Sequence, residues 1–280
     1  MRNALPSLFL SHGSPMIALE PGAAGAFMQR LGPAIDRGFG RPKAILAISA
    51  HTSARAPVLL AAPRHETIHD FGGFDPKLFT LRYDAPGAPE LASRVVSLMS
   101  SAGLDVEPTN QGGLDHGIWT VLRYVYPEAD IPVLPLAFVP TQAPAQQFAL
   151  GQVLAPLRQE GVLVLGTGSM THNLRRVFAH GLDAPADQPE IAESTAFRRW
   201  MLQRGAERDW DALFDYRRLA PHAADMHPTD EHLLPWYIAA GAGGRDTTPI
   251  RIHDSVTFGS LAMDAYAFGP EAETLKAALG

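Results

Sequence analysis

Short apolar runs of strand type alternate with helical patterns along most of the 280 residues. The runs are continuous, without an alternating polar face, which is typical of strands buried on both sides. We predict strands at residues 5–10, 44–49, 58–61, 131–138 and 162–166. We predict helices at residues 22–30, 89–101, 145–159, 188–204, 229–240 and 271–279. This order predicts an α/β protein, a three-layer α/β/α sandwich around a mostly parallel, mixed central sheet.

The stretch 250–268 departs from that pattern and resembles two strands around Gly259 and Ser260. We expect an antiparallel addition at a sheet edge or near the site. Loops rich in Pro and Gly are short, and no repeat or long linker divides the chain. With 46% hydrophobic residues the chain can bury one large core, so we expect residues 1–280 to form a single catalytic domain.

Charge and hydropathy exclude two classes of partner. The formal net charge is −6 and no run of Lys or Arg is longer than a pair, which argues against nucleic acid and favours a small molecule. No apolar run approaches the roughly 18 residues that a membrane span needs, and the first apolar stretch is too short for a signal peptide. We therefore expect no membrane partner and a cytoplasmic location; the oligomeric state stays open.

The chain has no cysteine, so any transition metal must be held by nitrogen and oxygen ligands. Histidine is the commonest such ligand and also a proton carrier near neutral pH. His12, His51 and His172 each lie in a polar turn after a predicted strand. Because ligands of open parallel sheets bind beyond the carboxyl ends of the strands, these three side chains can converge. His227 follows no strand, but a turn at Pro228 that caps the next helix could bring it to the same place.

His116 lies in the glycine-flanked segment QGGLDHG. Glycine lets backbone approach a ligand closely, so His116 is either an acid or hydrogen-bond donor that touches substrate, or a loop residue bonded to Asp115. Gly166 and Gly168 lack the lysine of a phosphate-binding loop, and we interpret them as a tight turn that aims His172 inward. Ser14 lacks the surroundings of a hydrolase nucleophile. For the other histidines we expect ordinary hydrogen-bonded roles, with His69 and His222 as the first exceptions to consider: His65, His69, His180, His222, His232 and His253.

Seven short motifs occur in one order between residues 8 and 268: SHGSP, AISAHT, HDFGGF, GLDHG, GTGSMTHN, HPTDEH and SLAMDAYAFG. Together they resemble the class III extradiol ring-cleavage dioxygenases of the DOPA 4,5-dioxygenase type. The resemblance implies that His12, His51 and His227 bind a metal. It implies that His172 is an acid/base residue that can also be a ligand, and that His116 is a second catalytic histidine.

The resemblance implies cleavage of a catechol ring next to its hydroxyl groups by O₂, giving a muconic semialdehyde, with Fe(II) as the active metal and Zn(II) possible in the purified protein. Wider class III enzymes use a carboxylate as third ligand, which His227 replaces here. Glu231 could orient His227, although a carboxylate is also expected near a helix N-terminus. Two alternatives stay open: a zinc-dependent hydrolase that uses the same histidines, and a non-enzymatic protein of the same fold.

Overall fold

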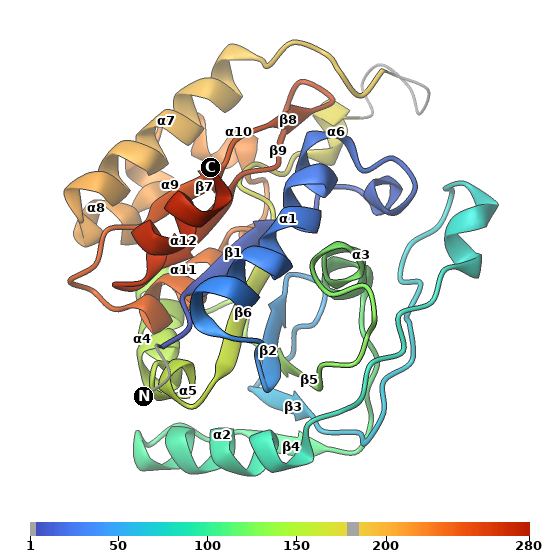
Figure 1. The fold of residues 1–280 in the computed structure, drawn as a ribbon. Helices are drawn as coiled ribbons and strands as arrows, with labels where there is room; N and C mark the ends of the chain where they lie inside the picture. The colour runs from blue at the N-terminus through green and yellow to red at the C-terminus, as the bar shows by residue number, and fades with distance from the viewer. Residues whose placement is uncertain (1–3, 178–184) are drawn as a thin grey trace.

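The computed structural model describes residues 4–177 and 185–280, so His180 lies outside the described part. Its centre is an eight-stranded sheet with the order β4-β3-β5-β2-β6-β1-β10-β7 (Figure 1). Strands β5, β2, β6 and β1 are parallel, whereas β3 and β10 run antiparallel to their neighbours β5 and β1. The strands are β1 Ser7–Ser11, β2 Ala44–Ser49, β3 Val58–Leu60, β4 Glu107–Thr109, β5 Val133–Ala137, β6 Val162–Gly168, β7 Ile250–His253 and β10 Ala265–Phe268.

Helices cover both faces of this sheet and enclose a hydrophobic core on each side. One face carries α1 Gly22–Phe39, α3 His116–Val125 and α12 Ala272–Leu279. The other carries α2 Pro89–Ser101, α4 Pro144–Leu154, α5 Pro156–Gln159, α7 Ala192–Glu207, α8 Trp210–Phe214, α9 Tyr216–Leu219, α10 Ala223–Met226 and α11 Leu234–Gly243. Short helical turns are η1 Pro15–Ala18, η2 Pro76–Thr80 and α6 Leu174–Val177. The predicted α/β/α sandwich around a mixed sheet is confirmed.

The C-terminal stretch forms the predicted antiparallel addition, but as four short strands. Strands β10 and β7 extend the sheet edge beyond β1, while β8 Val256–Thr257 and β9 Leu261–Ala262 make a separate hairpin around Gly259. Within the described residues, no helix combines the length and the apolar character needed to cross a membrane.

Two helix boundaries differ from the prediction in ways that affect the site. The helix expected from residue 229 begins only at Leu234, so the preceding residues form turns that can point side chains at the sheet edge. Helix α3 was not predicted; it begins at His116 because the Asp115 carboxylate accepts hydrogen bonds from the backbone N–H groups of Gly117 and Ile118, as an N-cap does.

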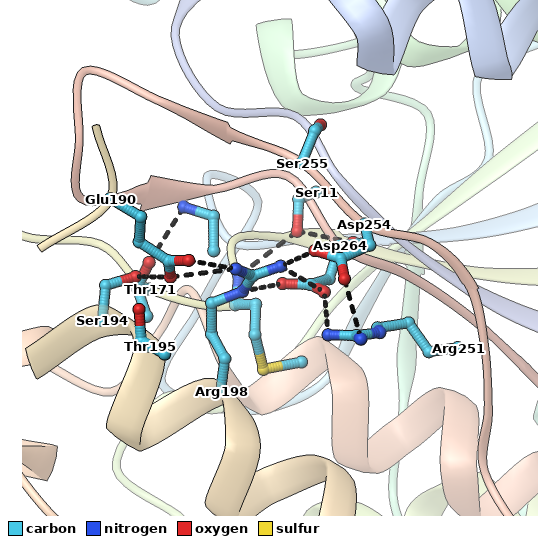
Figure 2. A network of polar contacts seen from close by, with 12 residues as sticks. Ser11, Thr171, Glu190, Ser194, Thr195, Arg198, Arg251, Asp254, Ser255 and Asp264 are labelled. Atoms are coloured by element: carbon cyan, nitrogen blue, oxygen red, sulfur yellow. Dashed lines mark hydrogen bonds and ion pairs between the residues drawn. The ribbon is translucent and has the colours of Figure 1, made fainter. Parts of the chain in front are cut away.

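A buried ion-pair network fastens the C-terminal segment to the end of β1 (Figure 2). Arg198 of α7 donates to both carboxylate oxygens of the fully buried Asp264, at 2.6 and 2.9 Å, and also pairs with Glu190 and Asp254. The backbone carbonyl of Asp264 in turn accepts from the backbone N–H and the hydroxyl of Ser11. Breaking such a buried pair is costly, because it leaves an uncompensated charge. Asp264 is therefore held in place, and its bonds to Ser11 fix the position of Ser11 and of His12 after it.

Candidate metal centre

His12 and His51 meet at the carboxyl ends of β1 and β2, as the sequence predicts. Their Nε2 atoms are 3.1 Å apart. The Nδ1 atom of His12 lies 3.0 Å from the Thr167 hydroxyl, which donates its own hydrogen to the carbonyl of Gly117. That hydroxyl must therefore accept from His12, so Nδ1 of His12 carries the hydrogen and Nε2 presents a lone pair.

The third nitrogen of this cluster comes from His232. Its Nε2 lies 3.3 Å from Nε2 of His51, and its Nδ1 lies 3.1 Å from a carboxylate oxygen of Glu231. Burial alone would raise the pKa of Glu231, but the hydrogen bond and charge of His232 lower it to about 2. An ionised carboxylate only accepts, so Nδ1 of His232 is the protonated nitrogen and Nε2 is free to bind a cation.

The structure places His227 elsewhere, so it does not join His12 and His51 as expected. Its Nε2 lies 2.9 Å from the carbonyl of Met170 and must donate there, while its ring packs near Phe197. The physical reason is the late start of α11, which leaves turns after His227 and brings the second histidine of HPTDEH to the cluster. Glu231 bonds to His232 and not to His227, and His232, for which we expected an ordinary hydrogen-bonded role, lies beside His51.

Nε2 of His51 lies 3.1 Å from Nε2 of His12 and 3.3 Å from Nε2 of His232, and both spacings fit ligands of one divalent cation. Nε2 of His12 and Nε2 of His232 are both acceptors, because their Nδ1 atoms carry the hydrogens. One hydrogen on Nε2 of His51 cannot bond to both of them. For metal–nitrogen bonds of about 2.0–2.1 Å, tetrahedral ligands are about 3.3 Å apart, close to the observed spacing. Burial, followed by the like charges of neighbouring histidines, lowers the pKa of His12 well below its usual value and that of His51 to about 3. Each ring is therefore neutral near pH 7, the state that binds metal.

His172 lies beside the cluster and stacks on His232. The ring centroids are 3.5 Å apart and the planes are within 7° of parallel. Imidazole lone pairs lie in the ring plane, so two parallel stacked rings cannot both point at one ion. This geometry favours the acid/base role of His172 over its role as a ligand. Burial lowers its pKa to about 2, with the like charges of His232 and His227 next, so the ring is neutral.

His116 also reaches the site, and its partner is not the one expected from sequence. Its ring centroid lies 4.0 Å from that of His51 and 5.4 Å from that of His12. Its Nδ1 is 3.0 Å from both carboxylate oxygens of Asp70, whereas Asp115 caps the helix. Asp70 is a residue that sequence reasoning missed, although it lies within the motif HDFGGF.

The remaining histidines of the described chain lie outside the cluster. His65 and His69 bond to the carbonyls of Val133 and Leu81, and His253 bonds to the Ser255 hydroxyl. His222 occupies the N-cap position of α10 in a left-handed conformation, and its side chain makes no capping hydrogen bond there. His69 is connected to the site through an aromatic group, because Phe71 of that group contacts the His116 ring edge-on at 5.6 Å. The group is His69, Phe71, Phe74, Phe79 and Trp119.

Gly166 and Gly168 do not form the predicted tight turn, because both lie within β6. They instead let the segment that carries His232 approach the sheet. The backbone N–H of Ser169 donates to the carbonyl of His232, and a Cβ at Gly168 would lie only 2.0 Å from that carbonyl oxygen. Gly168 therefore contributes to the site, because its lack of a side chain lets the backbone of His232 lie close to β6.

We expect Gly168→Ala to weaken Zn(II) binding and to destabilise the fold, since overpacking typically costs about 1–3 kcal/mol. Calorimetric Zn(II) titration and thermal unfolding measure the two effects. Gly38→Ala is the matched control, because a Cβ at Gly38 meets no atom within 4 Å. Zn(II) affinity in Gly168→Ala equal to that of the control would contradict the close approach described here.

The fold and the cluster are those of an α/β protein whose histidines could hold a metal ion, and comparison with known proteins specifies its class. Residues 6–269 match the family model described as the catalytic LigB subunit of aromatic ring-opening dioxygenase. Proteins named 4,5-DOPA dioxygenase extradiol are 35% identical in Beta vulgaris, over 95% of this chain and 97% of the relative, and 35% identical in Escherichia coli K12, over 95% of each. The crystal structure of an uncharacterized E. coli K12 protein superposes with a TM-score of 0.76 and 31% identity, over 95% of this chain and 100% of the other.

The chain belongs to the LigB family of aromatic ring-opening dioxygenases. It is a class III extradiol dioxygenase, a metal-dependent enzyme that opens the ring of catechol-like substrates with O₂. The resemblance stated from the sequence motifs is thereby confirmed, and the zinc hydrolase and non-enzymatic alternatives lose their support.

Proposed function

We propose that the enzyme cleaves DOPA or a closely similar catechol, with Fe(II) held by His12, His51 and His232. The observation that carries this proposal is the pair of short Nε2–Nε2 distances around His51, 3.1 Å to His12 and 3.3 Å to His232. The substrate class follows from the relatives in Beta vulgaris and E. coli, whose names specify 4,5-DOPA. The cytoplasmic location expected from the sequence stays a prediction.

His12, His51 and His232 would hold the iron, which would supply the redox chemistry with O₂ that zinc lacks. An all-nitrogen site also suits Zn(II), so the purified protein can carry zinc without being active. We propose Fe(II) as the active metal on that chemical ground.

We assign the proton transfers to the two histidines beside the cluster. Neutral His172 accepts the proton of a catechol hydroxyl, and its stacking on His232 keeps it next to the metal ligands. His116 has its Nδ1 committed to Asp70, which leaves Nε2 to contact substrate or O₂. Phe71, which lies against His116, offers an aromatic surface for the substrate ring.

Anaerobic reconstitution tests this function. Metal-free protein receives Fe(II) or Zn(II), then air and a panel of catechols that includes DOPA. We expect O₂ uptake and a yellow product with Fe(II) and DOPA, and neither with Zn(II) or with the His12→Ala variant. Equal turnover with Zn(II) would exclude the iron assignment. A catechol that reacts much faster than DOPA would replace the substrate assignment.

A further inference from the structure

Asp70 lies in a loop that is fastened to the start of α3. The backbone N–H of Ile68 donates to the carbonyl of Leu114, and the indole N–H of Trp119 donates to the carbonyl of Ile68. A backbone bond at Leu114 and a side-chain bond from Trp119 therefore hold this loop against the segment that carries His116. The position of the Asp70 carboxylate relative to His116 is set by the fold.

The Asp70 carboxylate contacts two histidines of the site at once. One oxygen accepts from the backbone N–H of His116 at 2.9 Å, and both oxygens lie 3.0 Å from its Nδ1. The second oxygen also lies 3.7 Å from Nδ1 of His51. The proposed ligands each have a partner at Nδ1. That partner is the Thr167 hydroxyl for His12 and the Glu231 carboxylate for His232. Asp70 is the group in the corresponding place for His51.

We propose that Asp70 is a positioning residue that couples the metal site to the acid/base site, by holding His116 as its Nδ1–H tautomer and by supporting His51 through its Nδ1. An ionised carboxylate can only accept, so it fixes which nitrogen of His116 faces the substrate. Groups that bond to the remote nitrogen of a metal-binding histidine orient the ring and increase its basicity. One side chain thus acts on both a ligand and a catalytic histidine.

This inference rests on the proposed assignment of His51 as a ligand and His116 as a catalytic residue. The Asp70→Asn variant keeps the size of the side chain but removes its charge and half of its acceptor capacity. We expect Zn(II) affinity to fall about 10-fold or more, the scale found for such outer partners, and kcat with Fe(II) to fall by a similar factor. The catechol KM should change less than about twofold, because Asp70 does not touch substrate.

Asp84→Asn is the matched control. Asp84 is a carboxylate of the same loop that accepts from the backbone N–H and the hydroxyl of Thr67 at 3.1 and 2.8 Å, and no bond of it to a site histidine is present among the described residues. We expect its Zn(II) affinity and kcat to stay within about twofold of the wild type. Equal losses of Zn(II) affinity and kcat in both variants would overturn the proposal, because the effect would then come from disturbance of the loop and not from the Asp70 carboxylate.

A double-mutant cycle tests whether Asp70 acts through His116. In a His116→Gln background, Asp70→Asn should reduce kcat much less than it does in the wild type, since the group through which it acts is gone. Its effect on Zn(II) affinity should persist, because that effect acts through His51. A full reduction of kcat in both backgrounds would overturn the coupling to His116.

The imidazole ¹⁵N spectrum of the Zn(II)-loaded wild type provides a test that needs no variant to fold. We expect His116 to be protonated at Nδ1, and the Nε2–H tautomer would overturn the proposal. Zn(II) affinity and the tautomer are independent of turnover. Failure of the DOPA assignment would appear as an inactive wild type, whereas failure of this proposal would appear as an unchanged Zn(II) affinity in Asp70→Asn.

Discussion

His232→Gln is expected to reduce metal affinity more than about 100-fold and to abolish ring cleavage, because it removes one of three converging nitrogens and ligand loss exceeds the effect of losing an outer partner. His227→Gln is expected to retain stoichiometric metal. A glutamine amide at position 227 can still donate to the carbonyl of Met170, which is the bond that the histidine makes. Metal content after dialysis and calorimetric titration measure both outcomes.

The two variants lie in one motif and carry the same substitution, so each controls for the other. The result that would reverse our assignment is metal loss in His227→Gln with retention in His232→Gln. In that case the ligand set inferred from the sequence resemblance would hold, and the cluster described here would not be the metal site.

His172→Phe is expected to reduce kcat about 10²–10⁴-fold, the usual contribution of a general acid or base, while metal content stays near that of the wild type. Phenylalanine keeps a planar ring that can stack on His232, so the metal ligand stays supported while the proton acceptor is lost. His172→Ala removes both the ring and the stacking. Comparing the two variants separates proton transfer from support of His232.

Saturating-substrate turnover and metal analysis of the same samples give the result. Wild-type turnover in His172→Phe would remove His172 from the mechanism. Loss of metal in both variants would instead identify it as a ligand, which the parallel stacking of the rings argues against.

Local patterns in the sequence were sufficient to predict the layers of the fold and the placement of His12, His51 and His172 at one sheet edge, because continuous apolar strands place the residues that follow them there. They were insufficient for His232. The choice between His227 and His232 depends on where α11 begins, and that is decided by the close packing of the helix start against Gly166 and Gly168 of β6. Asp70 was missed for a related reason: its contact with His116 joins a loop to the start of α3, and only the tertiary structure brings these two segments together.

The cluster draws on opposite ends of the chain, since His12 follows the first strand and His232 precedes the last large helix, while Ser11 is fastened to Asp264. Synthesis proceeds from the N-terminus, so a growing chain exposes His12 and His51 long before the third nitrogen exists. A nascent chain or a fragment that ends before residue 232 lacks one of the proposed ligands. With the proposed ligands, metal loading would follow synthesis of most of the chain, and the ion would bridge the earliest and latest parts of the fold.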